Sequence, residues 1–273
     1  MRTTVFLIIF MINTIVTYAG EADLKSENEF WKNDYFVQSN VDVRDSTVIV
    51  IIDNEEQEYH LADLPDAFIE WSVKRRKKTL SDIRSGIMPS FAGPHNGIVA
   101  TCGAKRNDTQ YKINNAVKGM GYCPGEDSID SLLTLLKETY DYSMEEKLSV
   151  LEELYDNIDE FFAKDKLVSL ELYSGKGFET GTFINQMLNP KVAIVFLDIP
   201  SYELKAVAAM YHPENPALTE YQSKLIEYTN LIHSYFHGDF NREFITVVYH
   251  ITEVFDNSPA KEARGRRLIP QFP

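Results

Sequence analysis

The strongest constraint on the fold is a strand-like pattern in the second half of the chain. Residues 191–198 (KVAIVFLD) are almost wholly apolar and rich in β-branched side chains, and Asn189-Pro190 and Pro200 bound them. Because β-branched side chains fit a pleated sheet and proline interrupts one, this segment predicts a buried strand. Other segments with strand-like patterns are residues 47–52, 98–101, 167–173, 203–211 and 244–255.

Apolar residues at three-and-four spacing predict helices between these strands. The longest helical stretch covers residues 128–162 and is expected to break around residues 141–143. Between Glu126 and Asp165 the chain has 13 acidic residues and three lysines, so much of its negative charge lies on this stretch. The other two predicted helices cover residues 64–83 and residues 216 or 217 to 235.

The first 19 residues predict a secretory signal peptide. Arg2 supplies a positive start, residues 5–16 are almost wholly apolar, and Thr17-Tyr18-Ala19 places small residues before a cut at Gly20. The apolar run of about a dozen residues is shorter than the roughly 20 that a membrane span needs. An uncleaved N-terminal anchor is the alternative. We expect a secreted, extracellular protein without a transmembrane segment.

Composition divides the chain into three parts. After the signal peptide over residues 1–19, residues 20–46 are polar and predict an irregular N-terminal segment. Residues 47–273 contain no linker rich in Ser, Gly or Pro. They therefore predict a single α+β domain with a mainly antiparallel β-core.

Two features agree with secretion. Asn107-Asp108-Thr109 is an acceptor sequence for N-glycosylation. Cys102 and Cys123 are the only cysteines, and an oxidising compartment would let them form a disulfide. Two unpaired thiols are the alternative. Two cysteines are too few for a disulfide scaffold or a cysteine-rich zinc site.

The net charge of −14 limits the partners of this chain. A polyanion is repelled by the nucleic-acid backbone and by anionic membranes, so no nucleic acid is expected. The acidic pairs Glu145-Glu146 and Glu152-Glu153 could bind calcium loosely, although they lack the residue order of a tight calcium loop and a solvated helix face is the default interpretation. A homodimer, and an association with calcium or extracellular matrix, are our partner predictions.

His233 and His237 are the candidate metal ligands. They lie four residues apart, so both imidazoles are expected on one helix face, where they could share a metal ion. Two surface histidines near a helix end are the alternative. A zinc protease motif needs Glu directly after the first His, and Ser234 stands there instead. The chain also lacks the G-x-S-x-G and phosphate-loop sequences, which disfavours those hydrolase classes.

Two basic clusters stand out in this acidic chain. Lys74-Arg75-Arg76-Lys77-Lys78 could bind a sulfated glycan or be cut by a basic-residue protease, or it could form the solvent face of a helix. Arg264-Gly265-Arg266-Arg267 likewise has the pattern of a convertase cleavage site.

Several motifs in the second half of the chain stand in one particular order. They are Gly177-Phe178-Glu179-Thr180, residues 189–196, residues 203–208, Val247–Phe255, Ser258-Pro259-Ala260-Lys261 and Arg264 or Arg266. In this order they resemble the FMN-binding split barrel of pyridoxamine 5′-phosphate oxidase-like proteins, over roughly residues 167–267. This resemblance implies a split-barrel-like β-core with flanking helices, into which residues 128–162 would be an acidic helical insertion.

The family holds the FMN phosphate with Arg and Lys residues before Asn-Pro, but residues 180–188 contain neither. Lys176, Lys191 or the basic cluster at 264–267 could substitute only if the fold brings them to the site. We therefore expect FMN to bind weakly or not at all. The favoured function is a secreted acidic glycoprotein that acts by binding rather than catalysis. A flavin-dependent oxidoreductase of the same fold and a matrix- or mineral-associated structural protein are the alternatives.

Overall fold

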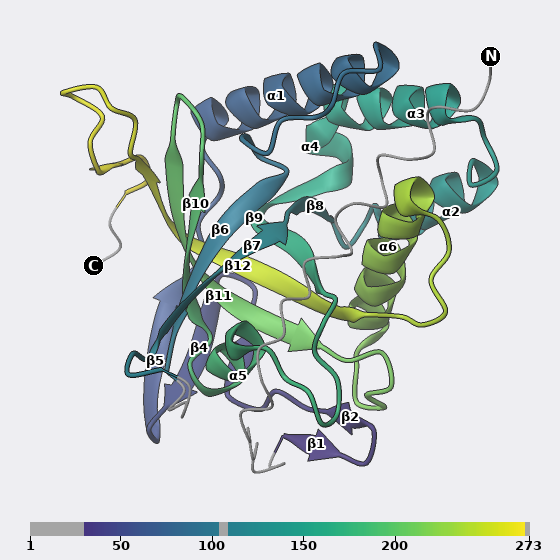
Figure 1. The fold of residues 1–273 in the computed structure, drawn as a ribbon. Coiled ribbons are helices and arrows are strands. Elements are labelled where there is room, and N and C mark those ends of the chain that lie inside the picture. The colour runs from purple at the N-terminus through teal and green to yellow at the C-terminus, as the bar shows by residue number, and fades with distance from the viewer. Residues whose placement is uncertain (1–29, 104–108, 271–273) are drawn as a thin grey trace.

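The computed structural model describes residues 30–103 and 109–270 (Figure 1). Within these ranges a main sheet of eight strands has the order β7-β6-β10-β11-β12-β9-β8, and β13 pairs with β12. Every pairing is antiparallel, as the sequence predicted. The strands are β6 (Asn96–Cys102), β7 (Ile113–Gly119), β8 (Gly121–Pro124), β9 (Phe162–Glu171), β10 (Lys191–Phe196), β11 (Tyr202–Tyr211), β12 (Ile245–Asp256) and β13 (Arg266–Arg267).

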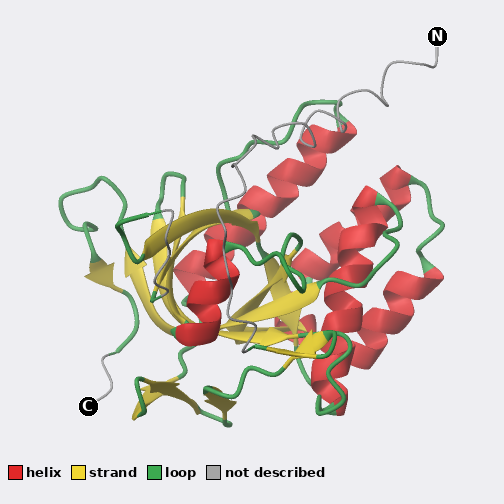
Figure 2. Ribbon diagram, turned by 60° about the horizontal axis from the view of Figure 1, so that its bottom comes forward, coloured by secondary structure: helices red, strands yellow, loops and turns green. Residues whose placement is uncertain are grey.

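The two edges of the main sheet are neighbours in the sequence. Strands β7 and β8 lie at opposite ends of the strand order, but only Met120 separates them along the chain. The sheet therefore has to curl until its edges approach each other, and Figure 2 shows this curvature with most helices on one side. No ladder between the described strands joins the edges, so the sheet is not a closed barrel. We call the gap between β7 and β9 the seam.

A buried ion pair crosses the seam. Lys118 Nζ on β7 lies 2.5 Å from Glu171 Oε2 on β9, and the Glu171 side chain is 1% exposed. Glu171 Oε1 also accepts hydrogen bonds from the backbone N–H groups of Tyr173 and Ser174. The ion pair holds the two strands together where backbone pairing is missing.

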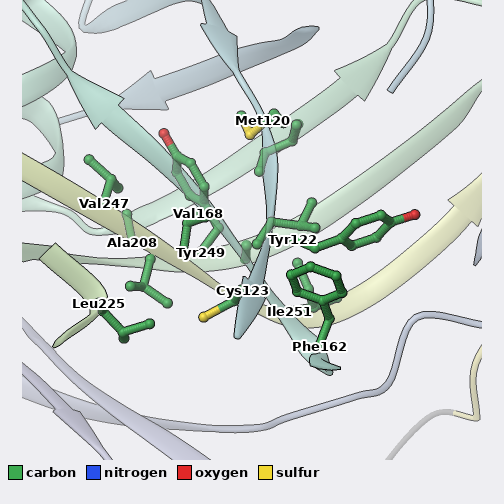
Figure 3. Packing of buried hydrophobic residues seen from close by; sticks show 14 of the residues in the cluster. Met120, Tyr122, Cys123, Phe162, Val168, Ala208, Leu225, Val247, Tyr249 and Ile251 are labelled. Atoms are coloured by element: carbon green, nitrogen blue, oxygen red, sulfur yellow. The ribbon is translucent and has the colours of Figure 1, made fainter. Parts of the chain in front are cut away.

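The interior of the curled sheet is a packed apolar core. Met120, Tyr122 and Tyr249 are all buried in it, and Figure 3 shows them among other side chains of the cluster. Gly97 on β6 faces the same interior, and a Cβ atom there would lie 2.9 Å from Met120 Cε and 2.7 Å from Ile194 Cγ2. Glycine is favoured at this position because the side chains of Ile194 and Met120 both approach the β6 backbone so closely.

The predicted helices form as six described elements. They are α1 (Asp66–Arg84), α2 (Ile129–Glu138), α3 (Met144–Asp156), α4 (Ile158–Phe161), α5 (Gly181–Leu188) and α6 (Glu220–His237). The expected break at residues 141–143 is confirmed, because Ser143 caps α3 in a capping box with Glu146. Thr219 and Gln222 form the same motif, so α6 begins a few residues later than predicted.

The structure corrects the irregular segment expected over residues 20–46, whose described part contains three short strands. These are β1 (Trp31–Lys32), β2 (Tyr35–Phe36) and β3 (Val41–Val43), and β3 pairs with the predicted strand β4 (Thr47–Ile52). Strand β5 (Glu55–His60) was not predicted from the sequence, and it pairs with the other edge of β4. Asp53 and Asn54 both have positive φ values of 52° and 63°, as the turn of a tight hairpin requires.

Two sequence predictions lie outside the described residues: the signal peptide over residues 1–19 and the glycosylation site at Asn107. In the ranges 30–103 and 109–270, no helix combines the length and apolar composition that a membrane crossing requires.

The seam gives the first testable prediction. Glu171→Leu would leave the Lys118 ammonium buried without its partner, which is expected to lower the free energy of unfolding by about 3–5 kcal/mol. The double variant Lys118→Met, Glu171→Leu should recover most of that loss, because neither charge then remains. Unfolding in urea measures the free energy of unfolding of the single and the double variant.

Asp34→Asn is the control, because it removes an exposed ion pair with Lys176 (3.2 Å) and should change stability by less than about 1 kcal/mol. If Glu171→Leu behaves like this control, the ion pair does not hold the seam.

The imidazole of His250 on β12 is buried. It lies between Lys166 and Val207 on the neighbouring strands, is 4% exposed, and neither ring nitrogen finds a partner among the described residues. Burial, and secondarily the charge of Lys166, lowers the pKa of His250 to about 3. The unfolded chain therefore takes up a proton at this residue near pH 6.5, well before the folded chain does.

This imidazole predicts a loss of stability in acid. Between pH 6 and 4 the contribution of His250 falls by up to about 1.4 kcal/mol per pH unit, because only the unfolded state is protonated. His250→Leu should thus be more stable than the natural protein by a margin that grows as the pH falls. Denaturant titrations at pH 6, 5 and 4 measure the margin, and a margin independent of pH would contradict the burial of a neutral imidazole.

Candidate functional site

A groove of about 670 Å³ lies on the outer face of the main sheet, beside β5. We call it the β5 groove. A volume of this size is typical of a small-molecule site. Its lining comes from β5 and from six strands of the main sheet, which are β6, β7, β10, β11, β12 and β13. The lining residues are Glu58–His60, Ala100–Cys102, Ile113, Lys191–Ala193, Lys205–Val207, Thr252, Glu253 and Arg267.

The register of the sheet explains the floor of the β5 groove. Ala100, Ala193, Lys205 and Glu253 lie opposite one another on consecutive strands and therefore share one face. The residues next to them in sequence, such as Ile194, are fully buried in the core on the other face. Because the side chains of Ala100 and Ala193 are single methyl groups, they leave a hollow between the longer side chains around them.

Three cations line the groove. Lys191 Nζ donates to Gln57 Oε1 (3.0 Å), and Arg267 Nη1 lies 2.9 Å from Glu253 Oε1. Lys205 forms an ion pair with Glu203, which is just outside the lining. Burial raises the pKa of Glu203, but hydrogen bonds from Lys205 and Asn257 outweigh burial and lower it overall.

The charge of the lining identifies the ligands that the groove can accept. Lys191, Lys205 and Arg267 contribute three positive charges, and Glu58 and Glu253 two negative ones, so the described lining totals +1 with His60 neutral. In a chain of net charge −14 this is a local reversal of sign. The groove therefore suits an anion of low charge with an apolar body.

Lys176, Lys191 and the 264–267 cluster were the cations expected to substitute at an FMN phosphate site if the fold brought any of them there. Lys191 and Arg267 both line the β5 groove, whereas Lys176 lies at a second cavity of about 410 Å³. That second cavity also holds Asp34, Glu171, Glu214 and Glu243, so carboxylates outnumber cations there. It is the less suitable of the two for an anion.

Helix α5 precedes Asn189-Pro190, where the family resemblance implies a phosphate site. Its buried polar side chains are used within the protein: Asn185 Nδ2 donates to Thr101 Oγ1 (3.0 Å) and Gln186 Nε2 to the Tyr249 hydroxyl (3.4 Å). Thr182 Oγ1 accepts from Asn114 Nδ2 at 2.7 Å. These contacts make α5 a structural element.

His233 and His237 lie side by side near the end of α6, as the spacing predicted. Their ring centroids are 4.7 Å apart, and His233 stacks on Phe240. Burial, followed by the charge of His237, lowers the pKa of His233 to about 4, and burial also lowers the pKa of His237. Among the described residues no group of three or more His, Cys, Asp or Glu is arranged to hold a metal, so a metal role stays a prediction.

The expected Cys102–Cys123 disulfide is wrong for this structure, in which both thiols are free. Cys102 is opposite Ile113 at one end of the β6–β7 pair, whereas Cys123 follows Gly119 at the other end. The seven residues of β7 extend about 20 Å, and a disulfide needs Cα atoms within about 7 Å. Cys102 is exposed and lines the groove, and burial raises the pKa of Cys123 to about 12.

The basic cluster at 74–78 lies within α1, and ion pairs or burial occupy most of its charges. Arg76 is 3% exposed and donates to the carbonyl oxygens of Pro94 and Met120, both at 2.9 Å. Arg75, Lys77 and Lys78 form ion pairs with Asp198, Asp156 and Asp82. The cluster is therefore largely structural.

The acidic pairs considered for calcium also have structural partners. Glu145 and Glu152 both bind Arg84, at 3.0 and 2.6 Å, and Glu146 completes the capping box of α3. Calcium binding stays a prediction.

Comparison with known proteins does not extend these observations. No protein-family model matches the chain. No curated protein matches it either.

The state of the cysteines gives a prediction that replaces the disulfide. Alkylation of the folded protein without reductant should modify one thiol, Cys102, because it is exposed while Cys123 is buried and protonated. Both should react after denaturation. Cys102→Ser should then show no labelling in the folded state. Mass spectrometry gives the number of alkylated thiols in each sample. If neither thiol reacts until a reductant is added, Cys102 and Cys123 form the disulfide that the sequence predicted.

Proposed function

We propose that this chain is a binding protein that takes a small organic monoanion in the β5 groove. The observation that carries the proposal is the meeting of Lys191, Lys205 and Arg267 over a floor of small side chains. The apolar part of the ligand would lie on Ala100, Ala193 and their neighbours, and its carboxylate or sulfonate would face the cations. Hydrogen bonds to charged groups contribute about 1.5–3 kcal/mol each, so such contacts decide affinity.

The wider proposal is a secreted, glycosylated acidic protein with a split-barrel-like domain that acts by binding. The signal-peptide pattern at residues 1–19 and the Asn107 sequence support secretion and glycosylation. The curled antiparallel sheet supports the relation to a split barrel. A homodimer and an association with calcium or matrix remain predictions, and the matrix alternative rests on the net charge of −14 alone.

A flavin-dependent oxidoreductase is the second candidate function. FMN combines an apolar ring system with a phosphate, and two of the substitute cations that the sequence analysis named do line one groove. However, a phosphate monoester carries about two negative charges near neutral pH. The lining totals only +1, and two of its cations already bind carboxylates. We therefore expect FMN to bind more weakly than a monoanion of similar size.

Fluorescence titration with anilinonaphthalene sulfonate, an apolar monoanion, tests the proposal. We expect a Kd in the micromolar range, and Lys191→Met should weaken binding about 10-fold or more because one charged contact is lost. Lys176→Met, at the second cavity, is the matched control and should leave the Kd unchanged.

Equal affinities for the two variants would place the probe elsewhere and overturn the proposal. A parallel titration with FMN separates the two functions. A yellow complex with a Kd below about 1 μM would make the oxidoreductase the better description.

A further inference from the structure

We call the last described residues, 257–270, the C-terminal strap, and Arg267 of this strap lines the β5 groove. Figure 1 shows it beside the end marked C. The start of the strap is held by the Asn257 N–H, which donates to the Ser201 carbonyl (2.8 Å). Its end is held by two β-pairs, Phe255 with Arg267 and Asp256 with Arg266, and by a hydrogen bond from the Leu268 N–H to the Val254 carbonyl (2.8 Å). Because a ladder of two pairs is short, the end of the strap is expected to open locally without unfolding the domain.

The strap presents three arginines within four residues. Gly265 has a φ of +69° and turns the chain, Arg264 is exposed, and the Arg266 side chain is 61% exposed. Arg267 follows in β13, and among the described strands β13 is bonded only by β12. Proteases bind their substrates as extended strands, and β13 is already extended with one edge unpaired.

We propose that the strap is a proteolytic processing site and that cleavage after Arg267 disables the β5 groove. A protease whose cleft carries carboxylates would bind the guanidinium groups of Arg264, Arg266 and Arg267. Water adds across the Arg267–Leu268 peptide bond, which leaves a carboxylate on Arg267 and an ammonium group on Leu268. The effect on the groove rests on the function proposed above, whereas the cleavage itself does not.

The contacts of the strap explain why one cut would matter. Leu268 and Ile269 pack against the hydrophobic core, and the Leu268 N–H bond to Val254 anchors the end of β13. Cleavage separates these anchors from Arg267 and adds a carboxylate next to Glu253, which Arg267 binds at 2.9 Å. The new charge repels Glu253, so Arg267 is expected to leave the groove together with its positive charge.

The other basic cluster provides an internal comparison. Residues 74–78 lie in the middle of α1, where the backbone is hydrogen-bonded within the helix and Arg76 is buried. A protease would have to unwind α1 to reach them. The structure thus distinguishes two clusters that look equally cleavable in sequence.

The experiment treats the folded, full-length chain with a proprotein convertase of the subtilisin class, which requires paired arginines. Intact-mass spectrometry should show loss of Leu268 and the residues after it, with α1 uncut. Arg264→Ala should slow cleavage at least 10-fold, whereas Arg44→Ala, at an exposed arginine far along the chain, should not. No cleavage, or a first cut within residues 74–78, would overturn the processing site.

The cut and uncut proteins are then compared by titration with anilinonaphthalene sulfonate. We expect the Kd of the cut protein to be at least 10-fold higher, with the thermal unfolding temperature little changed. Cleavage with an unchanged Kd would overturn the link between strap and groove. If the uncut protein does not bind the probe at all, the proposed function fails while the mass spectrum still decides the processing site.

Discussion

Met120 alone connects the two strands that lie at opposite edges of the main sheet. This covalent constraint forces the sheet to curl, because β7 has to pass directly into β8 on the far side. The rest of the core depends on it: Gly97 makes room for Met120, and the Lys118–Glu171 pair joins β7 to β9 across the seam. An open twisted sheet would need neither feature.

Curling also produces the outer face on which the β5 groove lies. The hairpin of β4 and β5 covers part of this face through Val48 and Val50, which pack on Val207. Next to that contact Ala100, Ala193 and Lys205 lie on the outer face, because successive residues of a strand face opposite sides of the sheet. Arg267, near the end of the chain, lines the same groove. The cations come from three separate strands, so their positive charge is local to the groove although the chain as a whole is strongly acidic.

Segments with a strong local pattern were predictable from the sequence. The β-branched segments at 191–198 and 244–255 and the capped helices lie close to where they were expected. Strand β5 (EEQEYH) was missed because its charged side chains hide the period of two, and its pairing with β4 stabilises it instead. The predicted disulfide is wrong because the separation of the two cysteines in sequence does not show that the length of β7 lies between them. Lys205 was not singled out as a site residue, since it comes near Arg267 only because β12 pairs with β11 on one side and with β13 on the other.

A crystal structure of the protein with bound anilinonaphthalene sulfonate would test the central claim most directly. We expect the aromatic rings to lie on Ala100 and Ala193, with the sulfonate about 2.7–3.2 Å from a nitrogen of Lys191, Lys205 or Arg267. A probe bound in the second cavity beside Lys176, or packed elsewhere with the β5 groove filled by side chains, would contradict the assignment of this groove as an anion site.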